Sequence, residues 1–156
     1  MDKLTHIDEK GRLRMVDVGG KPPIRRVAVA QGCFVAAETT LDRLFSGDLP
    51  KGEALAAARL AAIAAAKRTD ELIPLCHTLP LDHVQVDFHR LDQRSLRVTA
   101  TASLVARTGV EMEALVAVTA ACLTLYDMTK AIDKDLGIEN IKLVSKTKFP
   151  SKSDAE

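Results

Sequence analysis

Aromatic residues are scarce in this chain. Its 156 residues include no Trp, one Tyr and four Phe, which leaves little aromatic surface on which single-stranded nucleic acid could stack. An excess of charge of one sign is also lacking, since 22 Lys and Arg are balanced by 21 Asp and Glu, for a formal net charge of +1. This balance argues against the broad basic surface with which proteins bind nucleic acids or anionic membranes, so any anion site must be local.

Cysteines and long apolar runs are few as well. The three cysteines, Cys33, Cys76 and Cys122, lie far apart and form no CxxC pair, so they suit neither a disulfide framework nor a structural zinc site. No stretch approaches 18 uninterrupted apolar residues, and the amino-terminal segment is mixed in charge, without the apolar core of a signal peptide. These absences predict a cytoplasmic protein with reduced thiols and no membrane partner.

Motifs for metal and nucleotide binding are missing too. The sequence has no HExxH, EF-hand loop, P-loop or GxGxxG. His77, His83 and His89 are spaced by six residues, and the latter two on one strand face would lie roughly 20 Å apart, too far to share one ion. We therefore expect no metal site and no Gly-rich nucleotide loop.

The composition that is present predicts one domain with a single core. A chain of 156 residues with 47% hydrophobic residues can bury most of its apolar surface in one unit. Residues 1–26 carry charges, Gly19-Gly20 and Pro22-Pro23 without a sustained period, which predicts a mobile arm with a basic loop. The folded domain is expected over residues 27–149, followed by a disordered tail at 150–156.

Hydrophobic periodicity predicts the elements of this domain. An alternating stretch at 26–36 indicates a strand, and a short helix at 40–45 should stop at Gly47. The Ala-rich segment 51–68 predicts a helix with an apolar stripe of Leu55, Leu60 and Ile63, followed by a loop at 69–80 that two prolines brace. Residues 84–88 and 96–102 alternate as a β-hairpin.

The last helix and strand follow the hairpin. Thr108 and Glu111 fit a capping box that opens a long helix through Ile132, and Gly137 should end it. A final strand is expected around 141–143. The order strand, helices, strand, strand, helix, strand predicts an α+β, ferredoxin-like fold, in which helices pack on one face of an antiparallel sheet.

Charged side chains gather near the end of the long helix. Asp127, Lys130 and Lys134 are spaced to share one helix face, which would hold a carboxylate beside an ammonium group. A solvated ion pair that complements the helix dipole explains the same spacing, and spacing alone does not separate the two interpretations.

The end of the Ala-rich helix also has both a functional and a structural interpretation. Lys67 and Arg68 close an otherwise nearly uncharged helix before the apolar segment that contains Cys76 and His77. A cationic helix end beside a rigid apolar loop suits an anionic heterocycle, whereas the structural alternative is a helix stop with a buried, hydrogen-bonded histidine.

The acids of the long helix and the cations of the arm each have two interpretations as well. Glu111 and Glu113 lie in the first helical turn, where the capping box accounts for Glu111 but not for both acids. Lys21, Arg25 and Arg26 surround Pro22-Pro23 and could close over phosphates, or could form a solvated loop.

The segments LTHID, MVDV, KGEALAAARLAAIAAAKRT, LIPLCH, TGVEMEAL and LTLYDMTKA together resemble the cyclic pyranopterin monophosphate synthase family, often called MoaC. The resemblance covers residues 4–146, and LIPLCH and TGVEMEAL are its most specific motifs. It implies an enzyme of molybdenum cofactor biosynthesis, a phosphorus–oxygen lyase. The implied reaction converts 3′,8-cyclo-7,8-dihydroguanosine 5′-triphosphate into cyclic pyranopterin monophosphate and pyrophosphate. A ferredoxin-like fold and a homohexamer of three dimers, with pockets at the dimer interface, are implied as well.

The resemblance also assigns roles to residues. It implies Asp127 as the active-site acid. It further implies a substrate site lined by Leu75, Cys76, His77, Met112 and Glu113, and cationic or proton-transfer groups at Lys51, Lys67 and Lys130. A lysine near other cations can have a lowered pKa, which makes Lys130 beside Lys134 the candidate acid or base. Glu111, Arg68, Lys21 and Arg26 complete the predicted substrate-binding set, and the last two could stabilise phosphate oxygens as pyrophosphate leaves.

No cofactor is expected to be required, although Mg²⁺ could accompany the triphosphate. On a straight helix the 14 residues from Glu113 to Asp127 span about 21 Å, farther than one nucleotide pocket. We therefore expect a site built from two chains, with Ala114, Ala117, Ala120 and Ala121 allowing close approach of partner helices. The competing interpretations are a non-catalytic ferredoxin-like module that binds a small ligand and a zinc hydrolase using Cys76 and His77.

Overall fold

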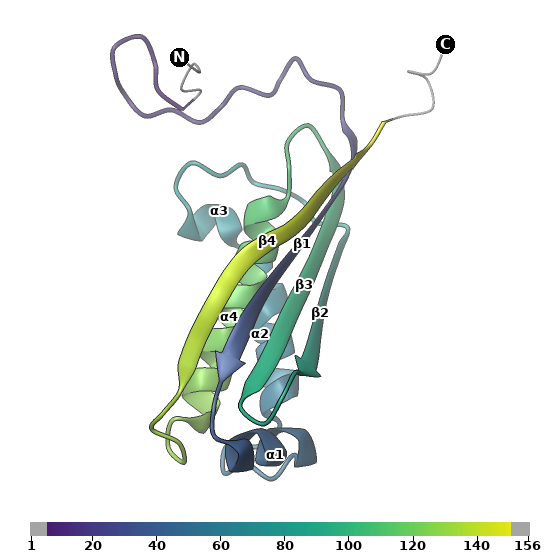
Figure 1. Cartoon of the computed structure of the whole chain (residues 1–156). Helices are drawn as coiled ribbons and strands as arrows, with labels where there is room; N and C mark the ends of the chain where they lie inside the picture. Colours follow the sequence, from purple (N-terminus) through teal and green to yellow (C-terminus); the bar gives the residue numbers. More distant parts are fainter. Residues whose placement is uncertain (1–5, 151–156) are drawn as a thin grey trace.

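The computed structural model describes residues 6–150. Its elements follow one another as β1 (Ile24–Val35), α1 (Glu38–Ser46), α2 (Ala54–Ala66), α3 (Thr69–Leu72), β2 (His83–Arg90), β3 (Ser95–Ala106), α4 (Glu111–Thr129) and β4 (Gly137–Phe149). Figure 1 shows the long helices α2 and α4 lying along one face of the sheet, with α1 across one end and α3 near the other.

The sheet has the strand order β2-β3-β1-β4, and every neighbouring pair is antiparallel. This order follows from two right-handed split β-α-β units that interleave, as in a ferredoxin-like fold. The predicted α+β fold class is confirmed. Strand β1 pairs along its length with both β3 and β4, so it is an inner strand of the sheet, and α4 packs against it.

The core between helices and sheet is built largely from small side chains. Ala54, Ala58, Ala62 and Ala66 form a buried stripe on α2, in which each alanine is four positions after the one before. The predicted stripe was wrong at Leu60, which is 69% exposed. Alanine allows α2 to pack closely against α4, because neither helix needs room for long side chains at the contact.

Helix α4 approaches the sheet closely at Gly32 of β1. A Cβ at this position would lie 2.8 Å from Cγ1 of Val118, shorter than van der Waals contact. Val118, Cys122 and Leu125 on this side of α4 are fully buried. The absence of a side chain at Gly32 therefore sets the distance between α4 and the sheet.

Both ends of α4 differ from the sequence expectation. The helix begins after Val110, which makes no side-chain capping bond, so the predicted capping box of Thr108 and Glu111 is wrong. Instead, Glu111 pairs with Lys146 of β4 across 3.2 Å. The helix ends at Thr129 with Lys130 as its C-cap, and Lys134 lies beyond it rather than on its face.

Other boundaries of helices and strands also differ from the prediction. The loop expected at 69–80 begins with the short helix α3, and Gly137 starts β4 instead of following the long helix. Gly47 ends α1 as predicted, in a left-handed conformation with φ of 74°. Strand β1 begins at Ile24, so Arg25 and Arg26 belong to the sheet and not to the arm.

The arm before β1 has little regular structure where it is described. Ile7 and Leu13 form an isolated antiparallel bridge, and Arg12 pairs with Asp8 inside the turn between them. Figure 1 shows this segment crossing above the end of the domain where α3 lies. Its predicted mobility stays a prediction. Residues 1–5 of the arm and 151–156 of the predicted tail lie outside the described residues.

Helix α4 is long and apolar enough to cross a membrane when only length and composition are considered, with a mean hydropathy of 1.3 over its best window. Of that window, 44% is buried inside the domain, against the sheet and α2. The central helix of a folded domain has the same properties, so the hydropathy of α4 is accounted for by the core.

Candidate active site

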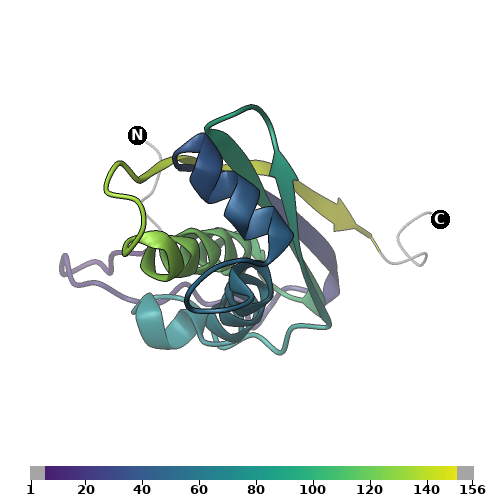
Figure 2. The same cartoon turned by 90° about the horizontal axis from the view of Figure 1, so that it is seen from below.

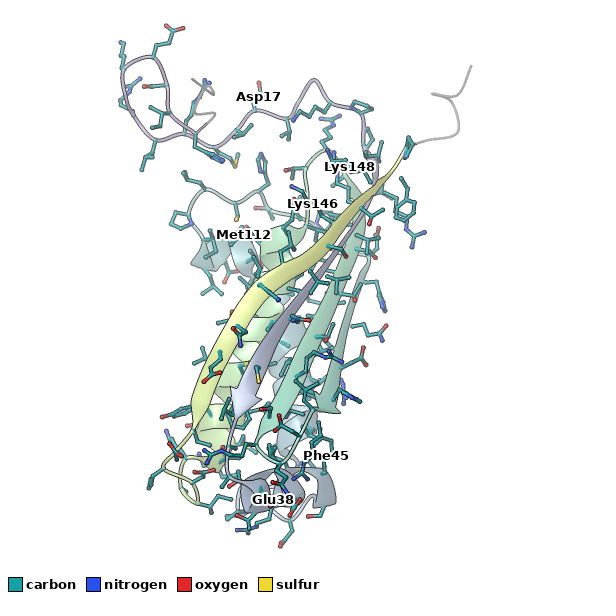
Figure 3. The ribbon with its side chains drawn as sticks, viewed as in Figure 1. Asp17, Glu38, Phe45, Met112, Lys146 and Lys148 are labelled. Atoms are coloured by element: carbon teal, nitrogen blue, oxygen red, sulfur yellow. The ribbon has the colours of Figure 1, made fainter. Side chains whose placement is uncertain are left out.

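The two specific sequence motifs meet around one open cavity of about 360 Å³. LIPLCH contributes Leu75, Cys76 and His77, and the start of α4 contributes Glu111, Met112 and Glu113. The arm adds His6, Val16, Val18 and Lys21, and the wall is completed by Leu79, Thr108 and Gly109. Seven residues of the predicted substrate site therefore line the same cavity. In Figure 3, Met112 marks its position below the arm.

A hydrogen bond of His77 connects the LIPLCH segment to the arm. The Nε2 atom of His77 lies 2.8 Å from the main-chain oxygen of Val16. Because that oxygen can only accept a hydrogen bond, the proton must be on Nε2. The structural alternative for this histidine was a buried, hydrogen-bonded side chain. The hydrogen bond is present, but His77 lies at the wall of the cavity and not in the core.

Glu113 is the buried acid of this site. Only 3% of the residue is exposed, and burial, partly offset by a backbone hydrogen bond, raises the pKa of its carboxyl to about 7, with smaller contributions from Glu111 and Asp70. A carboxyl with this pKa can give or take a proton near neutral pH. Helix capping could not explain why the first turn of α4 carries a second acid, Glu113. Its place in the cavity and its raised pKa offer an explanation.

Cys76 faces the same cavity but is not an activated thiol. Burial raises its pKa, and the carboxylates of Glu113 and Asp70 raise it further. A nucleophilic or metal-binding cysteine needs the thiolate, which cations favour and nearby carboxylates oppose. Cys76 is therefore suited to contact a ligand as a small apolar group.

A cluster of three charged side chains lies at the other end of α4. Lys51 Nζ donates to Asp127 Oδ2 at 3.0 Å and to the main-chain oxygen of Asp127 at 2.8 Å. Lys130 Nζ lies 2.6 Å from Asp127 Oδ1. All three side chains are about half exposed, so their ion pairs contribute little to stability. The three charged groups are accessible to a ligand that enters from solvent.

The pKa values of this cluster differ from the sequence expectation. The hydrogen bond with Asp127 raises the pKa of Lys130 instead of lowering it, and Lys134 turns away to donate to the main-chain oxygen of Lys130. Hydrogen bonds from Lys130 and Lys51 lower the pKa of Asp127. In this chain Lys130 is therefore a protonated acid and Asp127 a charged carboxylate.

The two groups of residues are separated along α4. The helix is continuous from Glu111 to Thr129, so the distance of about 21 Å between Glu113 and Asp127 that the helix rise predicts applies to this chain. In Figure 3, Met112 at the start of α4 lies toward the arm, and Glu38 and Phe45 of α1 lie at the opposite end of the domain. The cavity and the Lys51–Asp127–Lys130 cluster are not brought together within one chain.

The remaining predicted cations do not line the cavity. Arg26 donates from β1 to the main-chain oxygens of Ala106 and Arg107, both at 3.1 Å, beside the start of α4. Lys67 is the C-cap of α2, and Arg68 precedes α3, both exposed at the end of the domain that holds the cavity. Lys67 and Arg68 are therefore not part of the cavity lining.

Some residues of the site escaped sequence reasoning. Val16 and Val18 belong to the MVDV segment, whose apolar pair was a signal of burial inside an otherwise polar arm. Lys146 and Lys148 of β4 stand close to the start of α4 (Figure 3), and no local pattern connects them to Glu111. Within residues 6–150, no three His, Cys, Asp or Glu side chains gather as metal ligands.

Comparison with known proteins gives a consistent result over nearly the whole chain. The chain is 57% identical over 146 residues to the cyclic pyranopterin monophosphate synthase of Novosphingobium aromaticivorans, covering 94% of this chain and 92% of that protein. It is 55% identical to the protein of the same name from Roseiflexus sp., covering 94% of each, and 53% identical to that of Desulforapulum autotrophicum, covering 94% and 91%. A family model described as the MoaC family matches residues 15–148, which include both the cavity motifs and the charged cluster. The chain therefore belongs to the MoaC family.

Proposed function

We propose that this chain catalyses the cyclic pyranopterin monophosphate synthase reaction of molybdenum cofactor biosynthesis, in the cytoplasm. The substrate is 3′,8-cyclo-7,8-dihydroguanosine 5′-triphosphate, and the products are cyclic pyranopterin monophosphate and pyrophosphate. The observation that carries this proposal is the identity of 53–57% to proteins named for that activity over more than 90% of both chains. The gathering of both specific motifs around one cavity supports it.

The chemistry requires proton transfers during ring opening and ring closure, and the proposed groups divide between acids and bases. Glu113, with a pKa of about 7, can exchange protons with a heterocycle held against Leu75 and Met112. Lys130 is the proposed proton donor, and the hydrogen bond with Asp127 raises its pKa and keeps it protonated. Asp127 stabilises the positive charge of Lys51 and Lys130 and keeps them oriented.

Formation of the cyclic phosphate has its own charge requirement. A sugar oxygen bonds to the α-phosphorus, its proton passes to a base, and the bond to the leaving pyrophosphate oxygen breaks. Negative charge grows on the leaving oxygens, and cations stabilise it. Lys21 lines the cavity and is the proposed phosphate ligand. Arg26, which lies outside the cavity beside the start of α4, is the second proposed cation. Mg²⁺ could accompany the triphosphate as its counter-ion, bound by the substrate and not by a dedicated protein site.

The site is proposed to be completed by a second copy of the chain. Ala114, Ala117 and Ala121 are buried in the chain's own core and cannot contact a partner, contrary to the sequence expectation. Ala120 is partly exposed and lies midway between Glu113 and Asp127. An antiparallel crossing of two α4 helices there would bring Glu113 of one protomer beside Asp127 of its partner, and three such dimers would form a hexamer.

Turnover by the purified chain tests the proposed function. Protein dialysed against a chelator is incubated with an excess of the cyclic triphosphate, and the pyranopterin and pyrophosphate are quantified. We expect many turnovers per chain from the wild type and a loss of roughly a hundredfold or more in Asp127→Asn, the size expected for a group that orients proton transfer. Tight binding without product would favour the non-catalytic module, and activity restored only by zinc would favour a hydrolase.

A further inference from the structure

Asp133 is a buried carboxylate outside the cluster described above. It lies in the connection between α4 and β4 and is 7% exposed. Its Oδ2 accepts hydrogen bonds from the main-chain nitrogen of Ala37 at 2.7 Å and from Thr40 Oγ1 at 2.9 Å. Its Oδ1 accepts from the main-chain nitrogen of Asp135 at 2.9 Å. In Figure 2 the connection after α4 passes beside α1.

The carboxylate of Asp133 provides the capping acceptor that the start of α1 lacks. The N-cap of α1 is Ala37, which has no side-chain oxygen and makes no capping bond. Orphan N–H groups at a helix start favour a carboxylate, both as a hydrogen-bond acceptor and through the helix dipole. Asp133 provides this carboxylate from 96 residues away in sequence, so α1 is capped by the segment that follows α4.

The two segments that Asp133 joins are those that carry the charged cluster. On one side, the main-chain nitrogen of Asp133 donates to the oxygen of Thr129 at 3.1 Å, in a turn that follows Asp127 and contains Lys130. On the other side, α1 leads through Gly47 to the loop that holds Lys51. The half-exposed ion pair between Lys51 and Asp127 would by itself hold the two segments weakly.

We propose that Asp133 is a positioning residue for the reaction, which fixes Lys51 against Asp127 by binding the start of α1 to the turn after α4. The inference rests on the proposed function, because the cluster it positions is the proposed proton-transfer group. Asp133 does not touch the reacting atoms. Its contribution is to the geometry of the cluster, where a displacement of about 1 Å can reduce a rate by roughly a hundredfold.

Kinetics of four variants test this role. Asp133→Ala removes the acceptor, and Thr40→Val removes one donor while keeping the shape of the side chain. We expect a kcat reduced by roughly tenfold or more in Asp133→Ala and severalfold in Thr40→Val, with KM nearly unchanged because the cavity is intact. Thr40→Ser keeps the hydroxyl and should restore kcat. Asp135→Asn, in the same turn but with its side chain 87% exposed, is the matched control and should behave as wild type.

A second measurement does not depend on turnover. The carboxyl carbon of Asp127 is followed by NMR in protein labelled at aspartate, and is assigned by its loss in Asp127→Asn. Hydrogen bonds from Lys130 and Lys51 lower the pKa of Asp127, so release of Lys51 should raise it toward its ordinary value in Thr40→Val but not in Thr40→Ser.

The outcomes separate the two proposals. If Asp127→Asn is inactive while Thr40→Val and Asp133→Ala keep the wild-type kcat and the wild-type pKa of Asp127, the positioning role is overturned and the proposed function stands. If the wild type has no turnover but the pKa of Asp127 still moves in Thr40→Val, the function fails and the positioning of the cluster is supported. If Asp133→Ala does not fold, the comparison of Thr40→Val with Thr40→Ser tests the positioning role of Asp133.

Discussion

At the scale of single residues, the buried carboxyl of Glu113 has a consequence for stability. Burial raises its pKa from 4.5 to about 7, so the folded chain keeps a proton that the unfolded chain releases. The stability that this proton carries is fully present below pH 4.5 and is lost as pH rises toward about 7. Above pH 7 the folded state must hold a buried charge, which costs on the order of 2 kcal/mol after allowing for the open cavity beside it.

In Glu113→Gln the side chain cannot ionise, so the loss of stability between about pH 4.5 and pH 7 should disappear. Between pH 5 and pH 8 the free energy of unfolding should fall by roughly 2 kcal/mol more in the wild type than in the variant, measured by urea unfolding at both pH values. Glu111→Gln is the control, because it changes the neighbouring acid and leaves Glu113 in place. Equal pH dependence in wild type and Glu113→Gln would show that Glu113 is already charged in the folded state near neutral pH.

The sequence identified the residues of the site better than it described their surroundings. Cys76, Met112 and Glu113 were predicted to share a site and do line one cavity, because their motifs are specific. The pKa of Lys130 was predicted in the wrong direction, since its spacing from Lys134 suggested a cation pair. The helix ends between them, and the closest charge to Lys130 is Asp127. Where a helix ends depends on tertiary contacts, which periodicity does not contain.

At the scale of the elements, the contact between α2 and α4 depends on alanine. Ala62 is fully buried on α2, so Ala62→Leu must add three carbons to a packed interface and is expected to destabilise the fold by about 1–3 kcal/mol. Ala64→Leu, two residues on and exposed, makes the same chemical change with little effect. Thermal and urea unfolding of both variants measure the difference. Similar stability of the two would mean that the helices separate easily.

The elements were predictable where their pattern is local. The alternation of β2 and β3 and the left-handed stop at Gly47 come from side chains near one another in sequence, and both were found. The core stripe of α2 was predicted at Leu55, Leu60 and Ile63, because hydrophobicity favours the largest apolar residues. Leu55 and Ile63 do pack against the core, but Leu60 does not. The close packing of α2 against α4 selects alanine instead, and this packing is a contact between segments far apart in the chain.

At the scale of the whole molecule, the separation of Glu113 from Asp127 by about 21 Å means that the proposed reaction needs two chains. Two inactive variants should then complement each other. Lys130→Ala damages the end of α4, and Glu113→Ala damages its start, so a mixed dimer has one site with both defects and one intact site. At equal mixing half of the dimers are mixed, and about one quarter of the wild-type activity should return after dissociation and reassembly.

A second mixture separates shared sites from a general effect of mixing. Lys130→Ala combined with Asp127→Asn should regain nothing, because both changes affect the same half of the site and every site in a mixed dimer keeps one defect. Native mass spectrometry of chains with different masses establishes that mixed dimers formed. Activity in the first mixture and none in the second would place Glu113 and Lys130 of different chains in one pocket. Mixed dimers without activity in either mixture would mean that each chain carries a complete site, and that α4 must bend or the substrate must reach along it.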